Sequence, residues 1–214
     1  MITHLVGWAQ VVDGKWSEAI EWHKEGTAIL EAKDWATSLF LQPQYDDQTD
    51  YMVLVWEFET LADYEEWTET IHADADVQES IRRMELIFVP ESMSFFAYKG
   101  MSETRFLMES RSVSTYEIGW AQVADGKWNE AMEWHREGTA YFEANGWTTA
   151  LTLQPQYDGE TDYMVWIFEF ESLANYEKWY ETIHADAGVQ ESIRRMESIF
   201  VPKSMNFFPY KGVQ

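Results

Sequence analysis

The chain has 214 residues, of which 46% are hydrophobic, and its 38 acidic and 15 basic side chains give a formal net charge of −23. This much apolar material excludes global disorder. So acidic a surface, without a basic stripe, excludes nucleic acid and anionic membranes as expected partners. Because the chain has no cysteine, disulfides, thiolate metal sites and cysteine nucleophiles are excluded as well.

The sequence contains two similar units. Gly-Trp-Ala-Gln-Val at 7–11 recurs at 119–123, and Leu-Gln-Pro-Gln-Tyr at 41–45 recurs at 153–157. Most positions between these segments also agree, and chance does not produce such a repeat. We therefore expect a first unit at 1–100 and a second at 118–214. The connector at 101–117 is rich in Ser, Thr, Arg and Glu and has no clean periodicity.

The first half of a unit predicts a strand, a helix and a hairpin. Residues 4–12 are apolar and end at an Asp-Gly turn, which is typical of a strand. Residues 15–33 have apolar side chains at helical spacing with glutamates between them. Strands are then expected at 37–45, ending near Pro43, and at 51–59. The short polar segment between them predicts an antiparallel pair.

The second half predicts a broken helix and a last strand. Residues 61–72 form the first part of the helix. Asp76 followed by Glu79 resembles a capping box that restarts it through Ile87. Gly188 and Glu191 occupy these places in the second unit. The last strand is expected at 92–99.

The resulting order, β-α-β-β-α-β, predicts a ferredoxin-like α+β unit whose helices cover one face of a four-stranded sheet. The strands are apolar on both sides, so the other face also needs a cover. The sheet of the second unit is the obvious partner. We therefore expect one intramolecular, pseudo-dimeric α+β barrel with its helices outside.

At this point the chain resembles the dimeric α+β barrel superfamily, which includes antibiotic-biosynthesis monooxygenases and NIPSNAP-like proteins. The similarity rests on the element order, on Glu-Trp-His-Lys-Glu-Gly at 21–26 and on Ala-Asp-Tyr-Glu-Glu-Trp at 62–67. It covers both units and implies a dimer fused into one polypeptide. It also implies a hydrophobic ligand between sheet and helices, one pocket per unit.

The activities of that superfamily include cofactor-free oxygenation of polyketide-like aromatics, haem degradation, isomerisation and cyclisation, so the resemblance does not select a reaction. The haem-degrading branch would need an Asn on the first strand and a His late in the second helix. Here Gln10 holds the first place, His72 comes too early, and Val77 lies nearer the expected position. We therefore expect no cofactor.

Four histidines are candidates for catalysis. His23 and His135 lie on or beside the inward stripe of the first helix of each unit, where each could act as a general acid or base. A helix histidine bonded to a neighbour is the alternative. His72 and His184 end the first part of the broken helix, where they mark a pocket mouth or simply favour the helix C-terminus. Two histidines with Glu57 lack a compact ligand spacing, and no metal site is expected.

Aromatic and amide side chains on the strands are candidate ligand contacts, because rings stack on flat aromatic ligands and amides anchor them. Packing in the core is the alternative for each of them. The set comprises Trp8, Gln10, Gln42, Tyr51, Trp56 and Tyr98 in the first unit, and Trp120, Gln122, Gln154, Tyr163, Trp166 and Tyr210 in the second.

The units differ at positions that could line a pocket. Leu54, Trp56, Ile29 and Phe40 of the first unit are replaced by Trp166, Phe168, Tyr141 and Thr152 in the second. The two pockets are therefore expected to differ in shape, and one alone could be active.

We expect a small-molecule enzyme of the cofactor-independent monooxygenase, cyclase or isomerase type, acting on a hydrophobic aromatic or polyketide-like substrate. A non-catalytic hydrophobic-ligand-binding or stress-response barrel is the alternative, and a structural interaction protein is a third. The barrel is expected to be a monomer that could pair further. A cytoplasmic location is expected, because there is no apolar run of membrane-spanning length and no signal peptide.

Overall fold

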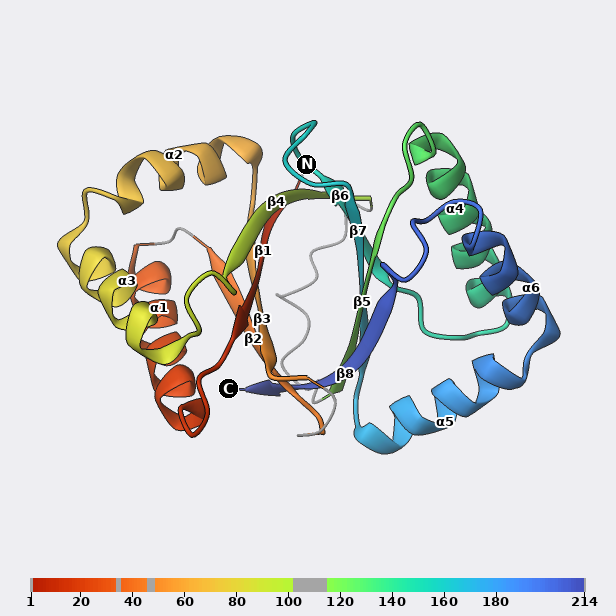
Figure 1. Ribbon diagram of the computed structural model, residues 1–214, viewed down its shortest axis with the longest axis horizontal. Coiled ribbons are helices and arrows are strands. Elements are labelled where there is room, and N and C mark those ends of the chain that lie inside the picture. The colour runs from red at the N-terminus through yellow and green to blue at the C-terminus, as the bar shows by residue number, and fades with distance from the viewer. Residues whose placement is uncertain (1, 34–35, 46–48, 102–114, 214) are drawn as a thin grey trace.

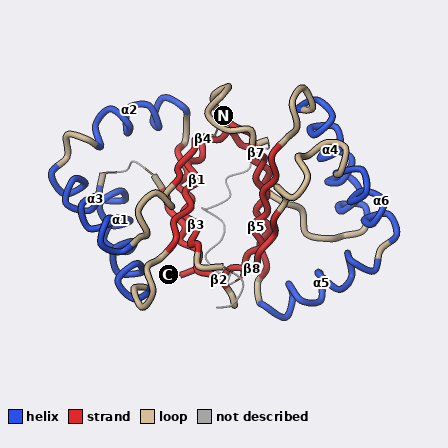
Figure 2. The backbone as a smooth tube through the Cα atoms, in the orientation of Figure 1, coloured by secondary structure: helices blue, strands red, loops and turns tan. Residues whose placement is uncertain are grey.

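The computed structural model describes residues 2–33, 36–45, 49–101 and 115–213. Eight strands close into one antiparallel barrel, and the helices lie outside it in two groups at opposite sides (Figures 1 and 2). This is the fold class that the sequence predicts.

The first unit has the expected element order. It comprises β1 (Thr3–Gln10), α1 (Trp16–Ala32), β2 (Thr37–Pro43), β3 (Tyr51–Phe58), α2 (Leu61–Ile71), α3 (Ala75–Ile87) and β4 (Ser94–Gly100). Strand β2 ends at Pro43, as predicted from the missing amide hydrogen of proline.

The second unit repeats this order. It comprises β5 (Thr115–Gln122), α4 (Trp128–Ala144), β6 (Leu151–Pro155), β7 (Tyr163–Phe170), α5 (Leu173–Ala185), α6 (Ala187–Met196) and β8 (Asn206–Val213). Strand β5 starts inside the range expected for the connector, and residues 102–114 of that range lie outside the described residues.

The barrel closes in the order β1-β3-β2-β8-β5-β7-β6-β4, with β4 pairing back to β1. Two joints connect the units: β2 pairs with β8, where Leu41 faces Gly212, and β4 pairs with β6, where Lys99 faces Gln154. Both edge strands of each four-stranded sheet thus pair with edge strands of the other sheet. The closed ring leaves no unpaired edge of the kind that promotes aggregation.

Alternation along each strand separates an inner core from the cores outside the barrel. One core fills the barrel and contains Val6, Val53, Ile118 and Val165. The other cores lie between the outer faces of the strands and the helices, with Met52 and Leu54 on the first side and Met164 and Trp166 on the second. A ligand pocket between sheet and helices must therefore be lined by the outward-pointing strand residues.

Gly119 has a packing role on that outer face. A Cβ atom added there would lie 2.1 Å from the ring of Phe207, so only glycine lets this ring lie against the strand. Gly7 and Phe95 repeat the arrangement in the first unit, with a separation of 2.3 Å.

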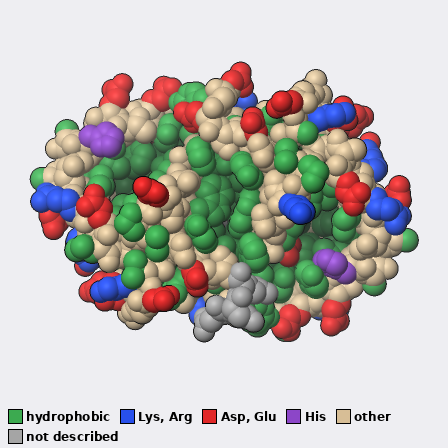
Figure 3. Space-filling model, in the orientation of Figure 1, with side chains coloured by type: hydrophobic (Ala, Val, Ile, Leu, Met, Phe, Trp, Pro, Cys, Tyr) green, Lys and Arg blue, Asp and Glu red, His purple; other side chains and the backbone are tan. Residues whose placement is uncertain are grey.

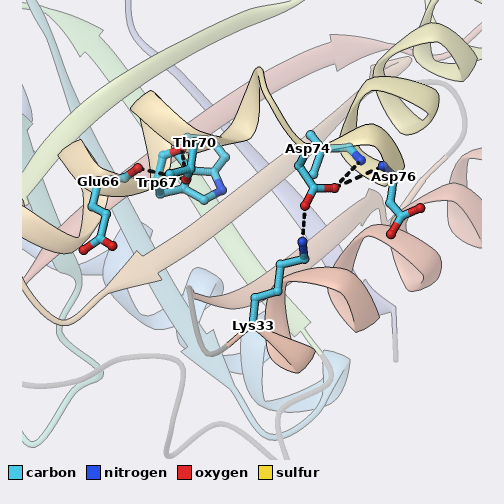
Figure 4. A network of polar contacts seen from close by, with 7 residues as sticks. Lys33, Glu66, Trp67, Thr70, Asp74 and Asp76 are labelled. Atoms are coloured by element: carbon cyan, nitrogen blue, oxygen red, sulfur yellow. Dashed lines mark hydrogen bonds and ion pairs between the residues drawn. The ribbon is translucent and has the colours of Figure 1, made fainter.

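The expected capping box at Asp76 is wrong. Helix α3 is capped two residues earlier by Asp74, whose carboxylate accepts hydrogen bonds from the backbone N–H groups of Asp76 and Val77. Figure 4 shows this carboxylate pointing both at the helix end and at the ammonium group of Lys33, the C-cap of α1. Asp186 takes the same role for α6, in place of the predicted Gly188. The spacing of Asp76 and Glu79 predicted the wrong cap, because Asp74, two residues earlier, is an aspartate as well.

Carboxylates are spread around the rim of the face shown in Figure 3, and hydrophobic side chains gather across its middle. None of the helices in the described part of the chain is long and apolar enough to cross a membrane.

Candidate active-site cavity

A cavity of about 530 Å³ lies between the outer face of the second unit's sheet and its helices. Its volume falls in the range of small-molecule sites, which are mostly apolar with a few polar groups. Strands β5 and β7 form the floor, and helices α4, α5 and α6 form the walls. Eight of the lining side chains are aromatic: Trp134, Tyr141, Phe142, Trp166, Phe168, Trp179, Tyr180 and Phe207.

These rings support one another. Phe168 and Trp179 have centroids 5.0 Å apart, and Trp166 stacks on Phe207 with centroids 5.8 Å apart. Trp134 meets Trp166 edge to face at 5.9 Å. Because each ring is held by its neighbours, the walls present fixed aromatic surfaces to an occupant.

The mouth of the cavity is also apolar. Tyr141, Tyr180, Ile193 and Phe207 line it, and each exposes 38–42% of its surface to solvent. Large apolar side chains that are exposed together at one opening are typical of binding sites. Single exposed apolar side chains are common on protein surfaces and indicate no function.

Glu117 is the one acidic side chain that the floor of the cavity buries. It sits on β5 with 4% of its surface exposed, and across the strands it pairs with Phe168. Burial raises the pKa of the Glu117 carboxyl to about 7. The hydroxyl of Tyr176 donates a hydrogen bond to Glu117 Oε1 at 3.4 Å and offsets part of this effect. A carboxyl of this kind exchanges protons near neutral pH.

Glu117 was not among the residues predicted from the sequence, because it was placed at the end of the connector. Its equivalent in the first unit is Leu5, which is buried in an apolar cluster. The exchange of leucine for glutamate in an otherwise apolar strand was the signal that could have identified it.

His135 lies in the wall between this cavity and a second one of about 960 Å³. The hydroxyl oxygens of Thr139 and Thr152 lie 3.4 Å and 3.3 Å from its Nε2 and Nδ1 atoms. Burial, with a smaller contribution from the charge of Arg136, lowers the pKa of His135 to about 4. The imidazole is therefore neutral at neutral pH and offers one donor and one acceptor.

His23, the equivalent in the first unit, is enclosed. Its ring lies against Phe40 with centroids 4.9 Å apart, and Thr27 contacts its Nε2 atom at 3.1 Å. Burial, followed by the charge of Lys24, lowers the pKa of His23 to about 4 as well. Both histidines are therefore neutral at neutral pH. Of the two, His135 borders the cavities described above.

The other two candidate histidines are exposed. His184 stands at the mouth of the cavity, where its ring stacks on Tyr180 at 3.9 Å and its Nδ1 atom lies 2.9 Å from the carbonyl oxygen of Tyr180. His72 is the C-cap of α2.

Most of the predicted ligand contacts lie inside the barrel and not in this cavity. Trp8 and Trp120 meet there at 6.1 Å, and Trp8 packs on Tyr98 at 6.5 Å. Alternation along the strands places the remaining members of this group on the same inner side. They are Gln10, Tyr51, Gln122, Tyr163 and Tyr210. His4, another buried histidine, pairs there with Glu57 at 3.3 Å.

The remaining candidates point outward. Trp56 packs on Phe95 at 5.7 Å in the first unit. Gln42 lies two residues after the outward-facing Phe40 in β2 and therefore shares its side of the strand. Gln154 borders the second cavity together with His135. Trp166 is the predicted ligand contact that lines the 530 Å³ cavity.

The fold is shared with solved structures at very low sequence identity. A candidate monooxygenase from Fusobacterium nucleatum subsp. nucleatum matches with a TM-score of 0.70 at 7% identity, over 100% of this chain and 93% of that one. An anthrone oxidase-like protein matches with 0.72 at 13% identity, over 100% and 91%. A candidate chlorite dismutase matches with 0.61 at 14% identity, over 100% and 95%. No family model and no curated protein matches the chain.

The chain has the dimeric α+β barrel fold. Both halves of this dimeric α+β barrel lie in one polypeptide, so they can carry different side chains. On the sheet face that the helices cover, Leu54 of the first unit corresponds to the larger Trp166 of the second. Phe40, beside His23, corresponds to the smaller Thr152, beside His135. The cavity of the second unit has a carboxyl, Glu117, on its floor.

Proposed function

We propose that the second unit is a cofactor-independent monooxygenase site for a hydrophobic, polycyclic aromatic substrate with an activated CH₂ or phenolic group. The observation that carries this proposal is Glu117, a carboxyl with a pKa of about 7 on the floor of an aromatic cavity. General bases work best when their pKa lies near the working pH. The structural similarity to an anthrone oxidase-like protein supports this class of substrate.

Glu117 takes the proton that activates the substrate. Ionised Glu117 removes a proton from the CH₂ group and leaves a carbanion that the fused rings delocalise. Tyr176 keeps its proton, because burial and then the charge of Glu117 raise its pKa, so its hydroxyl remains a donor to the carboxylate. The hydroxyl orients the base and moderates its basicity.

Molecular oxygen is the oxidant in the proposed reaction. The carbanion transfers one electron to O₂, and the two radicals combine to a peroxide at the same carbon. Loss of water from the peroxide leaves a ketone. In sum, R₂CH₂ and O₂ give R₂C=O and H₂O: one oxygen atom enters the product, and the other leaves as water with both hydrogens of the CH₂ group.

The cavity supplies position and enclosure. The rings of Trp134 and Trp166 stand at 80° to each other, so a fused-ring substrate can stack on one and meet the edge of the other. Neutral His135 can exchange one of its threonine contacts for a hydrogen bond to a phenolic or carbonyl oxygen. The histidine thereby orients the substrate, and the stronger base, Glu117, moves the proton.

Oxygen uptake with an anthrone as substrate tests the proposal, with quinone absorbance as a second signal. The rate should rise with pH through about 7, because the ionised form of Glu117 is the active one. Glu117→Leu, which installs the first-unit residue, should lower the rate by about 100-fold or more. A full rate in this variant, or a rate that does not depend on pH, contradicts the role of Glu117.

The exposed rings at the mouth favour a second function, a binding protein that takes up an aromatic ligand without converting it. In that case anthrones bind but no oxygen is consumed, and affinity depends on the aromatic walls instead of Glu117.

A further inference from the structure

Within the described part of the chain, the carboxyl of Glu117 has no basic partner in its cavity. Arg195 is the one lysine or arginine among the described residues that line the cavity, and its guanidinium is paired with Glu137 at 2.6 Å. Among the described residues, Tyr176 donates a hydrogen bond to Glu117, and that bond is long at 3.4 Å. A buried carboxylate without a cation is costly, so an occupant that brings a positive charge is strongly favoured there.

The walls around this carboxyl also suit a cation. Trp134, Trp166, Trp179 and Phe168 line the same cavity, and Phe168 is the cross-strand neighbour of Glu117. The faces of aromatic rings attract ammonium groups, tryptophan most strongly, and the attraction increases when water is excluded. Rings and a carboxylate together form a cage for a substituted ammonium ion.

We propose that this cavity binds hydrophobic ammonium ions, with Glu117 as their counter-ion and the tryptophan rings around the charged nitrogen. This ligand class concerns the cavity of the proposed function but not its reaction, since a paired Glu117 no longer accepts a proton. Such ions therefore act as competitive inhibitors of the proposed oxygenation.

The charge of the whole molecule favours the same ligands. With a formal net charge of −23, the protein attracts cations toward its surface. Asp186 and Glu191 lie near the opening, where Asp186 caps α6 and Glu191 belongs to the lining. The first unit lacks the buried carboxyl, because Leu5 takes its place, and it is not expected to bind such ions.

A matched pair of probes tests the proposal: naphthylmethyl trimethylammonium and neopentylnaphthalene, in which a carbon replaces the nitrogen and removes the charge. Binding is followed by tryptophan fluorescence of the full chain at about pH 8, where Glu117 is ionised. We expect the ammonium probe to bind at least about tenfold more tightly than its neutral twin. Equal affinities in the wild type overturn the proposal.

Glu117→Gln keeps the size of the side chain and removes its charge, so the preference for the ammonium probe should fall to about twofold or less. Glu117→Leu serves as a second variant if the glutamine is not tolerated, and circular dichroism verifies folding. Glu25→Gln, at the place in the first unit that corresponds to Glu137, changes the net charge equally and should keep the preference. A preference that survives in both Glu117 variants, or disappears in Glu25→Gln, refutes the counter-ion role.

The two proposals fail separately. Ammonium selectivity without oxygen uptake removes the oxygenase and retains the cation site. Oxygen uptake with no selectivity between the probes does the reverse. If both hold, the ammonium probe raises KM and leaves kcat unchanged.

Discussion

The same helix packs differently in the two units. In α1, the side chains of Trp22, His23 and Leu30 are buried against the sheet. In α4, their counterparts Trp134 and His135 are only partly buried and face a cavity. Since both helices have 17 residues and start at a tryptophan, helix formation does not explain the difference.

The strand beneath the helix does explain it. In the first unit, Phe40 covers the ring of His23, and the hydroxyl of Ser38 lies 2.6 Å from that of Thr27. In the second unit Thr152 and Ala150 hold these places. Thr152 reaches His135 only through its hydroxyl, at 3.3 Å, and Ala150 has no hydroxyl to meet Thr139. A few exchanges on the outward face of one sheet thus change the packing around the histidine, and the first unit serves as an internal control for the second.

The largest expected effect concerns stability against pH in Glu117→Leu. The carboxyl has an ordinary pKa of 4.5 when unfolded and about 7 when folded, so the unfolded wild type releases its proton first. Between these pH values the wild type loses about 3 kcal/mol relative to the variant, which has no proton to release. Urea unfolding of both proteins from pH 4.5 to 8 measures this. A difference that stays constant with pH contradicts the raised pKa.

Substitutions of the two equivalent histidines, His135 and His23, distinguish a role in catalysis from a role in packing. His135→Ala should lower the oxygenation rate by about tenfold, because a substrate hydrogen bond is lost. His23→Ala should leave the rate unchanged but lower the free energy of unfolding by about 2 kcal/mol, since it empties a packed site. Oxygen uptake and urea unfolding of both variants check these outcomes. A rate loss in His23→Ala would show that the first unit takes part.

A smaller effect is expected from the wall of the cavity. Trp166→Leu installs the first-unit residue Leu54 and removes an aromatic surface, so aromatic ligands should bind about fivefold to tenfold more weakly. Trp56→Phe changes the first unit to the residue of the second and should not affect binding. Fluorescence titration of both variants measures the affinities. Similar losses in both would place the ligand outside the cavity.

The smallest effect is expected at the mouth. The hydroxyl of Tyr141 donates to the Asp186 carboxylate at 2.9 Å and connects α4 to the start of α6. Lys33 makes the corresponding contact with Asp74 in the first unit (Figure 4). Tyr141→Phe should speed ligand release by about twofold, and Lys33→Met should not change it. Stopped-flow dissociation measures both rates. An equal change in both variants would mean that the contact acts only on stability.

Local patterns in the sequence predicted the elements well, because each depends on near neighbours. Helical spacing predicted α1, and Pro43 predicted the end of β2. The same local logic misplaced the cap of α3 at Asp76, since Asp74 and Asp76 look alike until backbone contacts distinguish them. Local patterns also gave no side for Trp8 and Tyr98, the predicted ligand contacts. Strand alternation directs these two side chains into the barrel and away from the cavity beneath the helices.

The sequence by itself determined the repeat, the order of elements and the need for two sheets to cover each other, because these follow from periodicity and from strands that are apolar on both sides. Only the tertiary structure decided which histidine borders a cavity and that Glu117 is buried. Burial and pKa depend on side chains brought together from α4, which follows β5 directly, and from β7 and α5, which lie more than 40 residues farther along the chain. The change from Leu5 to Glu117 is visible in the sequence, but the effect of that change on the carboxyl is set by the surrounding rings.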